Sequence, residues 1–95
     1  MKVKVQYFGF IQGMLGKKGE EFELREGSCL SDLLNKMARI YGEQFQREVY
    51  EPGEKDVKSG FTVTVNGLLF GQLRGVDTGL SAGDKITFMT VASGG

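Results

Sequence analysis

The sequence predicts an α+β fold, in which one main helix packs on one face of a mixed sheet of four to five strands. Two observations lead to this prediction. Residues 2–11, 20–25, 61–65 and 85–91 alternate between apolar and polar side chains, as half-buried strands do. Residues 30–41 repeat apolar side chains with the period of a helix. With 95 residues, 40% of them hydrophobic, the chain suffices for one small domain with a modest core.

The first two strands are expected to form a hairpin. Both alternate, and the stretch 12–19 between them carries three glycines, which is typical of a connection. Phe8 falls on the opposite face from the other apolar residues of its strand. The side chains expected on the buried face are Val3, Val5, Tyr7, Phe22 and Leu24.

The helix has the clearest signal in the chain. Ser28 stands where an N-cap residue is expected, and Gly42 follows the last apolar position as a residue able to take a positive φ. This helix must bury its apolar stripe against the sheet. The stripe consists of Leu30, Leu33, Leu34, Met37, Ile40 and Tyr41.

The segment 43–60 is rich in charge, contains the single proline and is expected to be a polar linker within the domain. Phe45 and Val49 are four residues apart, so a short second helix before residue 51 is compatible with the pattern. The linker then leads to the strand at residues 61–65.

The second half of the chain completes the sheet. Asn66-Gly67 is a strong hairpin signal, with residues 68–73 as the partner strand. Right-handed crossover places the last or the third strand parallel to the first. This order describes a β-grasp arrangement over residues 1–91, followed by a flexible tail at 92–95.

Composition excludes several classes of function. Lys and Arg total 12, as do Asp and Glu, so the chain lacks the basic surplus that nucleic-acid binding requires. Without histidine it can form no Ser-His-Asp or Cys-His catalytic site and no His-ligated metal site, and we expect no bound metal or cofactor. No stretch has the apolar length of a membrane span or a signal peptide, which favours a cytoplasmic protein.

Three local candidates for chemistry are weak. The glycines and lysines of residues 13–19 miss the spacing of a phosphate-binding loop. The carboxylates of the second strand and the nearby Glu26 are expected to form a solvated face. Cys29, the only cysteine, has no histidine to act as its base and is expected to be inert.

The end of the chain carries the remaining candidate. Gly94 and Gly95 close a four-residue tail that reaches about 13 Å from the last strand when extended. A terminal carboxylate can attack the α-phosphate of ATP, and the absence of side chains lets such a tail enter a narrow channel. The alternative is that these glycines are incidental, and chance alone produces such an ending about once in forty chains of this glycine content.

The capped helix, the TVTVNG turn, the LSAGDKITFM strand and the terminal GG resemble the ubiquitin-like sulfur carriers and modifiers. The likeness is greatest to the small subunit of molybdopterin synthase and to the small archaeal modifier proteins. It implies that an E1-like enzyme uses ATP and Mg²⁺ to adenylate Gly95, which then becomes a thiocarboxylate for sulfur transfer. The alternative it implies is conjugation of Gly95 to a substrate lysine. The chain would then be a carrier rather than an enzyme.

Strand parity also predicts a docking surface for such a partner. Phe8, Met89 and Leu69 are expected to point away from the core and form an exposed apolar patch near the tail. The partners expected are the E1-like enzyme, a synthase large subunit or lysine-bearing target proteins. A third possibility is a β-grasp module that binds its partners without covalent chemistry.

Overall fold

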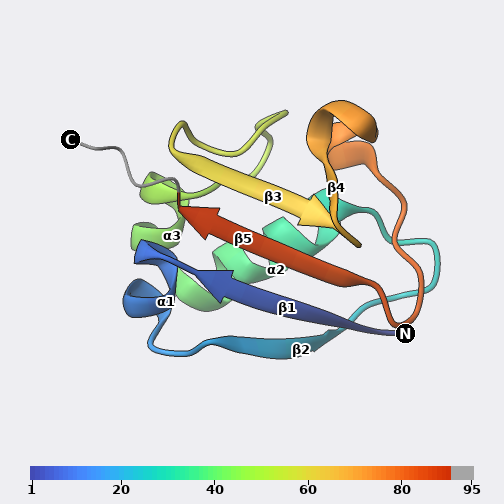
Figure 1. Ribbon diagram of the computed structural model, residues 1–95, viewed down its shortest axis with the longest axis horizontal. Coiled ribbons are helices and arrows are strands. Elements are labelled where there is room, and N and C mark those ends of the chain that lie inside the picture. Colours follow the sequence, from blue (N-terminus) through green and yellow to red (C-terminus); the bar gives the residue numbers. More distant parts are fainter. Residues whose placement is uncertain (91–95) are drawn as a thin grey trace.

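The structure is a computed structural model that describes residues 1–90, apart from the side chain of Phe70. Figure 1 shows the order of its elements. They are β1 (Lys2–Phe8), α1 (Phe10–Leu15), β2 (Gly19–Glu23), α2 (Leu30–Tyr41), α3 (Glu43–Glu48), β3 (Phe61–Val65), β4 (Leu68–Leu69), the 3-10 helices η1 (Phe70–Gln72) and η2 (Gly75–Asp77), and β5 (Lys85–Thr90).

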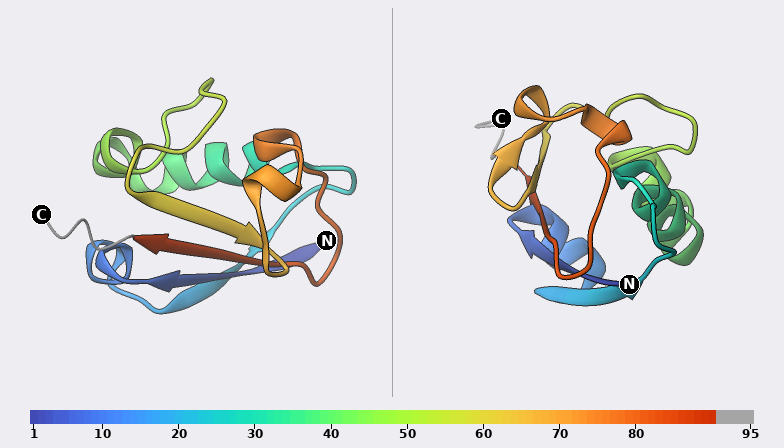
Figure 2. Two further views of the ribbon diagram at one scale, coloured as in Figure 1. Left: turned by 45° about the horizontal axis from the view of Figure 1, so that its top comes forward. Right: turned by 90° about the vertical axis from the view of Figure 1, so that its right-hand side faces the viewer.

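The five strands form one mixed sheet in the order β2-β1-β5-β3-β4. β1 pairs with β2 in antiparallel orientation and with β5 in parallel orientation, and β3 pairs with β5 in antiparallel orientation. Helices α2 and α3 lie on one face of the sheet (Figure 2). The α+β β-grasp prediction is therefore confirmed, with the last strand beside the first.

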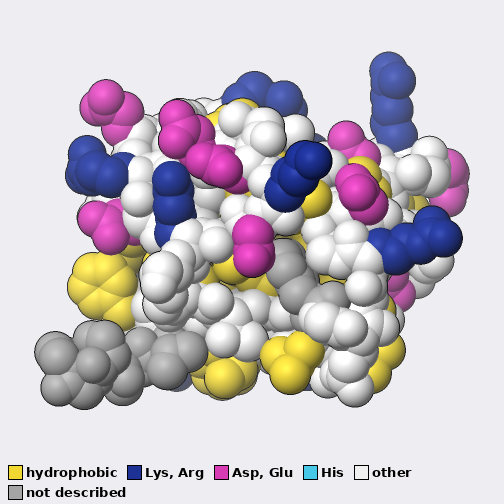
Figure 3. All heavy atoms as spheres, turned by 90° about the horizontal axis from the view of Figure 1, so that it is seen from above, with side chains coloured by type: hydrophobic (Ala, Val, Ile, Leu, Met, Phe, Trp, Pro, Cys, Tyr) yellow, Lys and Arg dark blue, Asp and Glu magenta, His cyan; other side chains and the backbone are white. Residues whose placement is uncertain are grey.

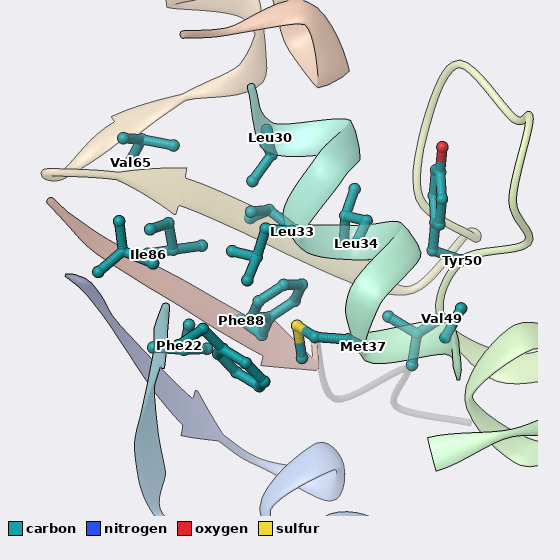
Figure 4. Packing of buried hydrophobic residues seen from close by; sticks show 14 of the residues in the cluster. Phe22, Leu30, Leu33, Leu34, Met37, Val49, Tyr50, Val65, Ile86 and Phe88 are labelled. Atoms are coloured by element: carbon teal, nitrogen blue, oxygen red, sulfur yellow. The ribbon is translucent and has the colours of Figure 1, made fainter. Parts of the chain in front are cut away.

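The core lies between α2 and the inner face of the sheet (Figure 4). The residues of the strands that were expected to face inward are all buried, and Phe88 of β5 is fully buried beneath α2. Burial of this apolar surface is the main favourable term in folding. The fully buried side chains of α2 are Leu30, Leu33, Leu34, Met37 and Ala38.

The first helix was not predicted. The strand expected at residues 2–11 ends at Phe8, because Gly9 turns the chain with a φ of +79°, and part of the expected connection is helix α1. Ile11 is fully buried, and Met14 and Leu15 pack against the core. Their helical spacing at positions 11, 14 and 15 is what holds α1 to the sheet.

The main helix ends as predicted, with Gly42 following it at a φ of +76°, but its first residues and one apolar position differ from the prediction. Cys29, not Ser28, is its N-cap residue: Cys29 has extended backbone angles, and its N–H donates to Asp32 Oδ2 at 2.8 Å. Ile40 is 56% exposed, whereas Ala38 is buried. The reason is that α3 packs against α2 on the side of Ala38, where Gln46 Nε2 donates to the Ala38 carbonyl at 3.1 Å.

The segment 43–60 does more than link two elements. The short second helix is present as α3, and both Phe45 and Val49 are fully buried, together with Tyr50 at 1% exposure. Three apolar side chains of this charge-rich segment thus complete the core at one end of α2.

The turn between β3 and β4 confirms the hairpin signal. Asn66 and Gly67 have φ values of +52° and +86°, the left-handed angles that a two-residue hairpin turn requires. The partner strand is shorter than the predicted 68–73: it contains only Leu68 and Leu69, after which the chain enters a 3-10 turn. Gln72 Oε1 accepts from the Leu69 N–H at 3.1 Å in this turn, which occupies a donor of the strand.

Candidate functional site

The site of interest is the end of the sheet at which β5 finishes. Gly94 and Gly95, predicted to be the reactive pair, lie outside the described residues. The structure describes the chain up to Thr90, five residues before the C-terminus, and so shows the surroundings from which the tail departs. In Figure 1, the end of β5 lies beside the end of β1 and near α1.

Two residues of the predicted patch are neighbours here. Phe8 and Met89 are paired in the parallel register of β1 and β5, and both point to the outer face of the sheet. Phe8 is 50% exposed and Met89 is 41% exposed. The sheet therefore presents an apolar pair on its outer face directly before the tail.

Leu69 is exposed on the same face but does not join this pair. It lies opposite Thr64 on β3, which in turn lies opposite Thr87 on β5. Leu69 thus lies two strands away from β5, level with Thr87, which is two residues before Met89. At usual strand spacings, the Cα atoms of Leu69 and Met89 are about 12 Å apart. Leu69 instead borders a surface hollow of about 240 Å³, together with Val57 and Phe61.

Phe10 extends the apolar surface at this end and was not predicted as a site residue. It is 64% exposed at the first position of α1, two residues after Phe8. In the strand predicted at residues 2–11, Phe10 has the same parity as Phe8, but it was not included in the predicted patch. In the structure Gly9 ends the strand, and Phe10 begins helix α1 instead. We define the tail-side patch as Phe8, Phe10 and Met89.

Charged side chains are distributed differently from this patch. Figure 3 shows Lys, Arg, Asp and Glu side chains over the helical side of the molecule, with hydrophobic groups along the opposite edge. On the outer face of the sheet, Lys4 and Lys85 are paired across β1 and β5, towards the end remote from Met89. The patch is thus the apolar end of a face whose other end carries lysines.

A polar junction joins the last residue of β5 to the start of α1. Thr90 Oγ1 donates to the Phe8 carbonyl at 3.2 Å and accepts from the Ile11 N–H at 3.1 Å. A Cβ atom placed on Gly9 would lie 2.6 Å from Thr90 Oγ1, so the approach needs glycine at position 9. Sequence reasoning could not find this junction, because it joins residues about eighty positions apart.

A second polar cluster lies at the edge of the core. Glu20 Oε2 accepts from the hydroxyls of Tyr7, at 2.6 Å, and of Tyr41. Burial and this carboxylate raise the pKa of both tyrosines above the usual value. Glu20 is therefore held by the fold, which corrects the expectation that all the carboxylates of this strand form a solvated face; Glu21 and Glu23 do point to solvent.

Cys29 and the carboxylates of the described residues form no further reactive or metal-binding cluster. Cys29 is half-buried, with Sγ 2.9 Å from Ser31 Oγ at the start of α2. Within residues 1–90, no three His, Cys, Asp or Glu side chains are grouped so that they could hold a metal ion. None of the described helices has the length and apolar character needed to cross a membrane.

Comparisons with known proteins identify a family and a set of structures with the same fold. The model of the ThiS family matches residues 5–95, nearly the whole chain. No curated protein is similar enough in sequence to count as a match.

Several solved structures have the same fold. SAMP1 from Haloferax volcanii superimposes with a TM-score of 0.80 at 17% identity, over 100% of both chains. A putative molybdopterin converting factor subunit 1 from Pyrococcus furiosus gives a TM-score of 0.73 at 28% identity, over 97% of this chain and 99% of that one. Urm1 from Trypanosoma brucei gives 0.79 at 18% identity, over 99% and 95%.

Proposed function

The chain belongs to the ThiS family of ubiquitin-like sulfur carriers and modifiers, and from this premise we propose that it is a sulfur carrier whose reactive group is the Gly95 carboxylate. An E1-like enzyme would activate this group, as the partner in an ATP-dependent reaction. The chain itself would supply recognition and a transferable acyl group, and no catalytic residue. The known structures of this kind are small carrier and modifier proteins rather than catalysts.

The proposed chemistry has two steps. A Gly95 carboxylate oxygen attacks the α-phosphorus of ATP bound with Mg²⁺ to the partner, which forms the acyl adenylate and releases pyrophosphate. A sulfur nucleophile supplied by the partner, a persulfide or hydrosulfide, then attacks the acyl carbon and displaces AMP. A hydrosulfide gives the thiocarboxylate directly, whereas a persulfide gives an acyl disulfide that a thiol must reduce.

The single observation that supports this proposal is the position of the diglycine ending. In the sequence, Gly94 and Gly95 come shortly after β5, a strand that is paired on both sides and whose Met89 forms an exposed pair with Phe8. A folded domain with an apolar surface at the root of a short tail can dock on one part of an enzyme while its carboxylate enters another part. We propose the tail-side patch as the main docking surface, with Leu69 as a separate contact. The large subunit of a molybdopterin synthase is a second candidate partner, because the Pyrococcus furiosus relative is described as a molybdopterin converting factor subunit.

The alternative function is protein modification. Here the amine of a substrate lysine attacks the activated Gly95 and forms an amide, with release of AMP or of an intermediate thiol. The similarity to SAMP1 and Urm1 supports protein modification as the alternative function, since SAMP1 of Methanosarcina acetivorans is described as a small archaeal modifier protein. Both functions use the same activated carboxylate and differ only in the nucleophile.

Intact-mass measurement distinguishes them. The chain is incubated with an E1-like enzyme from the same cells, MgATP and a sulfide or persulfide donor. We expect a mass gain equal to the replacement of one oxygen by sulfur, and its complete loss when Gly94 and Gly95 are deleted. Lysine conjugates that depend on Gly95, without the mass gain, would establish the modifier instead.

Two controls complete this experiment. Cys29→Ser is expected to retain the mass gain, because the half-buried thiol lies at the start of α2 and has no part in the proposed steps. The diglycine deletion should unfold at the same urea concentration as the full chain. If deletion of Gly94 and Gly95 leaves all activity of the chain intact, both covalent functions are contradicted and only a non-covalent binding module remains.

A further inference from the structure

The contacts at Thr90 have a consequence for the tail. β1 and β5 run side by side as far as the pair of Phe8 and Met89. After this pair Gly9 turns away into α1, with φ of +79° and ψ of −146°, and the parallel ladder ends. Thr90 still pairs with Phe61 of β3 on its other side. The end of β5 is thus supported by a neighbouring strand on one side only.

The Thr90 side chain supplies the missing support. Its hydroxyl donates to the Phe8 carbonyl at 3.2 Å and accepts from the Ile11 N–H at 3.1 Å, so one hydroxyl bonds both the last residue of β1 and the first turn of α1. The first N–H groups of a helix have no partner within it, and the Ile11 N–H finds its partner in Thr90. Gly9 permits this approach because a side chain there would lie 2.6 Å from Thr90 Oγ1.

These contacts link the docking surface to the beginning of the tail. Phe8 contributes its exposed ring to the tail-side patch and its carbonyl to the Thr90 hydroxyl. Strand ends with few contacts open readily, and each residue released would lengthen the tail by about 3.3–3.6 Å. A tail of uncertain length presents its carboxylate at a lower effective concentration to a site on the docked partner.

The geometry points to Thr90, together with Gly9, as a positioning element that fixes where the C-terminal tail leaves the domain relative to the docking surface. This inference rests on the proposed function, since it concerns delivery of the Gly95 carboxylate to the nucleotide site of an activating enzyme. Thr90 does not touch the reacting atoms. It acts through the five residues that follow it.

The test compares two threonines that make equivalent bonds. Thr90→Val removes the hydroxyl and keeps the shape of the side chain, and Thr90→Ser keeps the hydroxyl. Thr78→Val is the matched control: Thr78 Oγ1 donates to the Gly75 carbonyl at 2.7 Å and accepts from the Arg74 N–H at 3.1 Å. Thr78 lies beside the first residue of α2, where its carbonyl accepts from the Leu30 N–H at 2.8 Å.

Steady-state adenylation by the E1-like enzyme is the first measurement. We expect Thr90→Val to lower kcat about tenfold with KM changed less than about twofold, because docking is retained and delivery of the tail is impaired. Thr90→Ser should restore most of kcat, and Thr78→Val should leave kcat unchanged at a temperature where all variants are folded. An equal fall in Thr78→Val, or a change in KM alone, would overturn the inference. Thr90→Ala replaces Thr90→Val if the latter does not fold.

NMR relaxation of the free chain is the second measurement, and it does not depend on activation. The backbone order parameter of residue 90 should fall from about 0.85 to below about 0.6 in Thr90→Val, and should stay high in Thr78→Val. An unchanged value in Thr90→Val would overturn the inference even if adenylation slowed. If the wild-type chain is not adenylated at all, the proposed function fails, whereas a normal rate for Thr90→Val beside an active wild type refutes only the role of Thr90.

Discussion

The two faces of the sheet differ in how far their side chains are exposed. Phe88 and Met89 are adjacent in β5, yet Phe88 is fully buried under α2 and Met89 is 41% exposed on the outer face. The inner face carries aliphatic and aromatic side chains in one continuous core. Outside, the threonines Thr62, Thr64 and Thr87 separate the apolar pair near the tail from Leu69.

This difference shows how one strand serves two purposes. Side chains alternate along a strand, so every second residue can contribute to stability and the others remain available for contact with a partner. Substitutions on the inner face should therefore change the free energy of unfolding, and substitutions on the outer face should change binding. Three experiments test this division.

The largest expected effect is on the inner face. Phe88→Ala should lower the free energy of unfolding by about 3–5 kcal/mol, because it removes a buried ring and leaves a cavity between β5 and α2. That is a large part of the total stability of about 5–15 kcal/mol usual for a domain. Urea unfolding measures this loss as a lower urea concentration at the midpoint of the unfolding transition. A loss below about 1 kcal/mol would mean that the core under α2 is less tightly packed than the structure shows.

On the outer face, Met89→Glu should weaken binding with little effect on stability. We expect a loss of at least about tenfold in affinity for the activating enzyme, or about 1.4 kcal/mol, because a carboxylate would be buried against the partner. The change in unfolding free energy should stay below about 1 kcal/mol. Calorimetric titration and urea unfolding measure the two quantities.

Ile40→Glu is the matched control for this experiment. Ile40 is also an exposed apolar residue, but it lies on α2 and not on the outer face of the sheet. Its substitution should leave the affinity unchanged. Equal losses for Met89→Glu and Ile40→Glu would refute a docking surface on the sheet, and an equal loss for Leu69→Glu would extend that surface to β4.

The smallest expected effect is a dependence on alkaline pH that comes from the inner face. Burial, and then the hydrogen bond to Glu20, raise the pKa of Tyr7 above its value in the unfolded chain, which is near 10. The unfolded state therefore loses this proton first, so stability is complete below pH 10 and falls as the pH rises above it. Between pH 10 and 11 the loss should be about 1 kcal/mol for this group.

Tyr7→Phe tests the assignment. This variant should lose stability less steeply above pH 10 than the wild type, as measured by urea unfolding at several pH values. Absorbance of tyrosinate should show Tyr7 ionising only when the chain unfolds. An equally steep loss in Tyr7→Phe would place the alkaline sensitivity elsewhere, for instance at Tyr41, whose pKa is also raised.

The sequence predicts most of this fold because its local signals agree with one another. The alternation of β1 and β5 identified both the buried face and the exposed pair of Phe8 and Met89, since strand parity needs no knowledge of tertiary contacts. Helix α1 was missed because Gly13 lies within it and Gly16 and two lysines follow it, although Ile11, Met14 and Leu15 have helical spacing.

Other features depend on contacts between distant segments. The distance of Leu69 from Met89 follows from the register of three strands, which no local pattern contains. Ile40 is exposed and Ala38 buried because α3 covers one side of α2. Gly94 and Gly95 were proposed as the reactive pair from the sequence alone, whereas the bonds of Thr90 needed the structure.

The two outermost strands bear on how the protein behaves when it is concentrated. β4 is only two residues long, and β2 carries the exposed carboxylates of Glu21 and Glu23. Short or charged borders of a sheet discourage strand addition by a second molecule, and so oppose aggregation. A carrier of the proposed kind can thus stay dispersed while its tail-side patch remains uncovered.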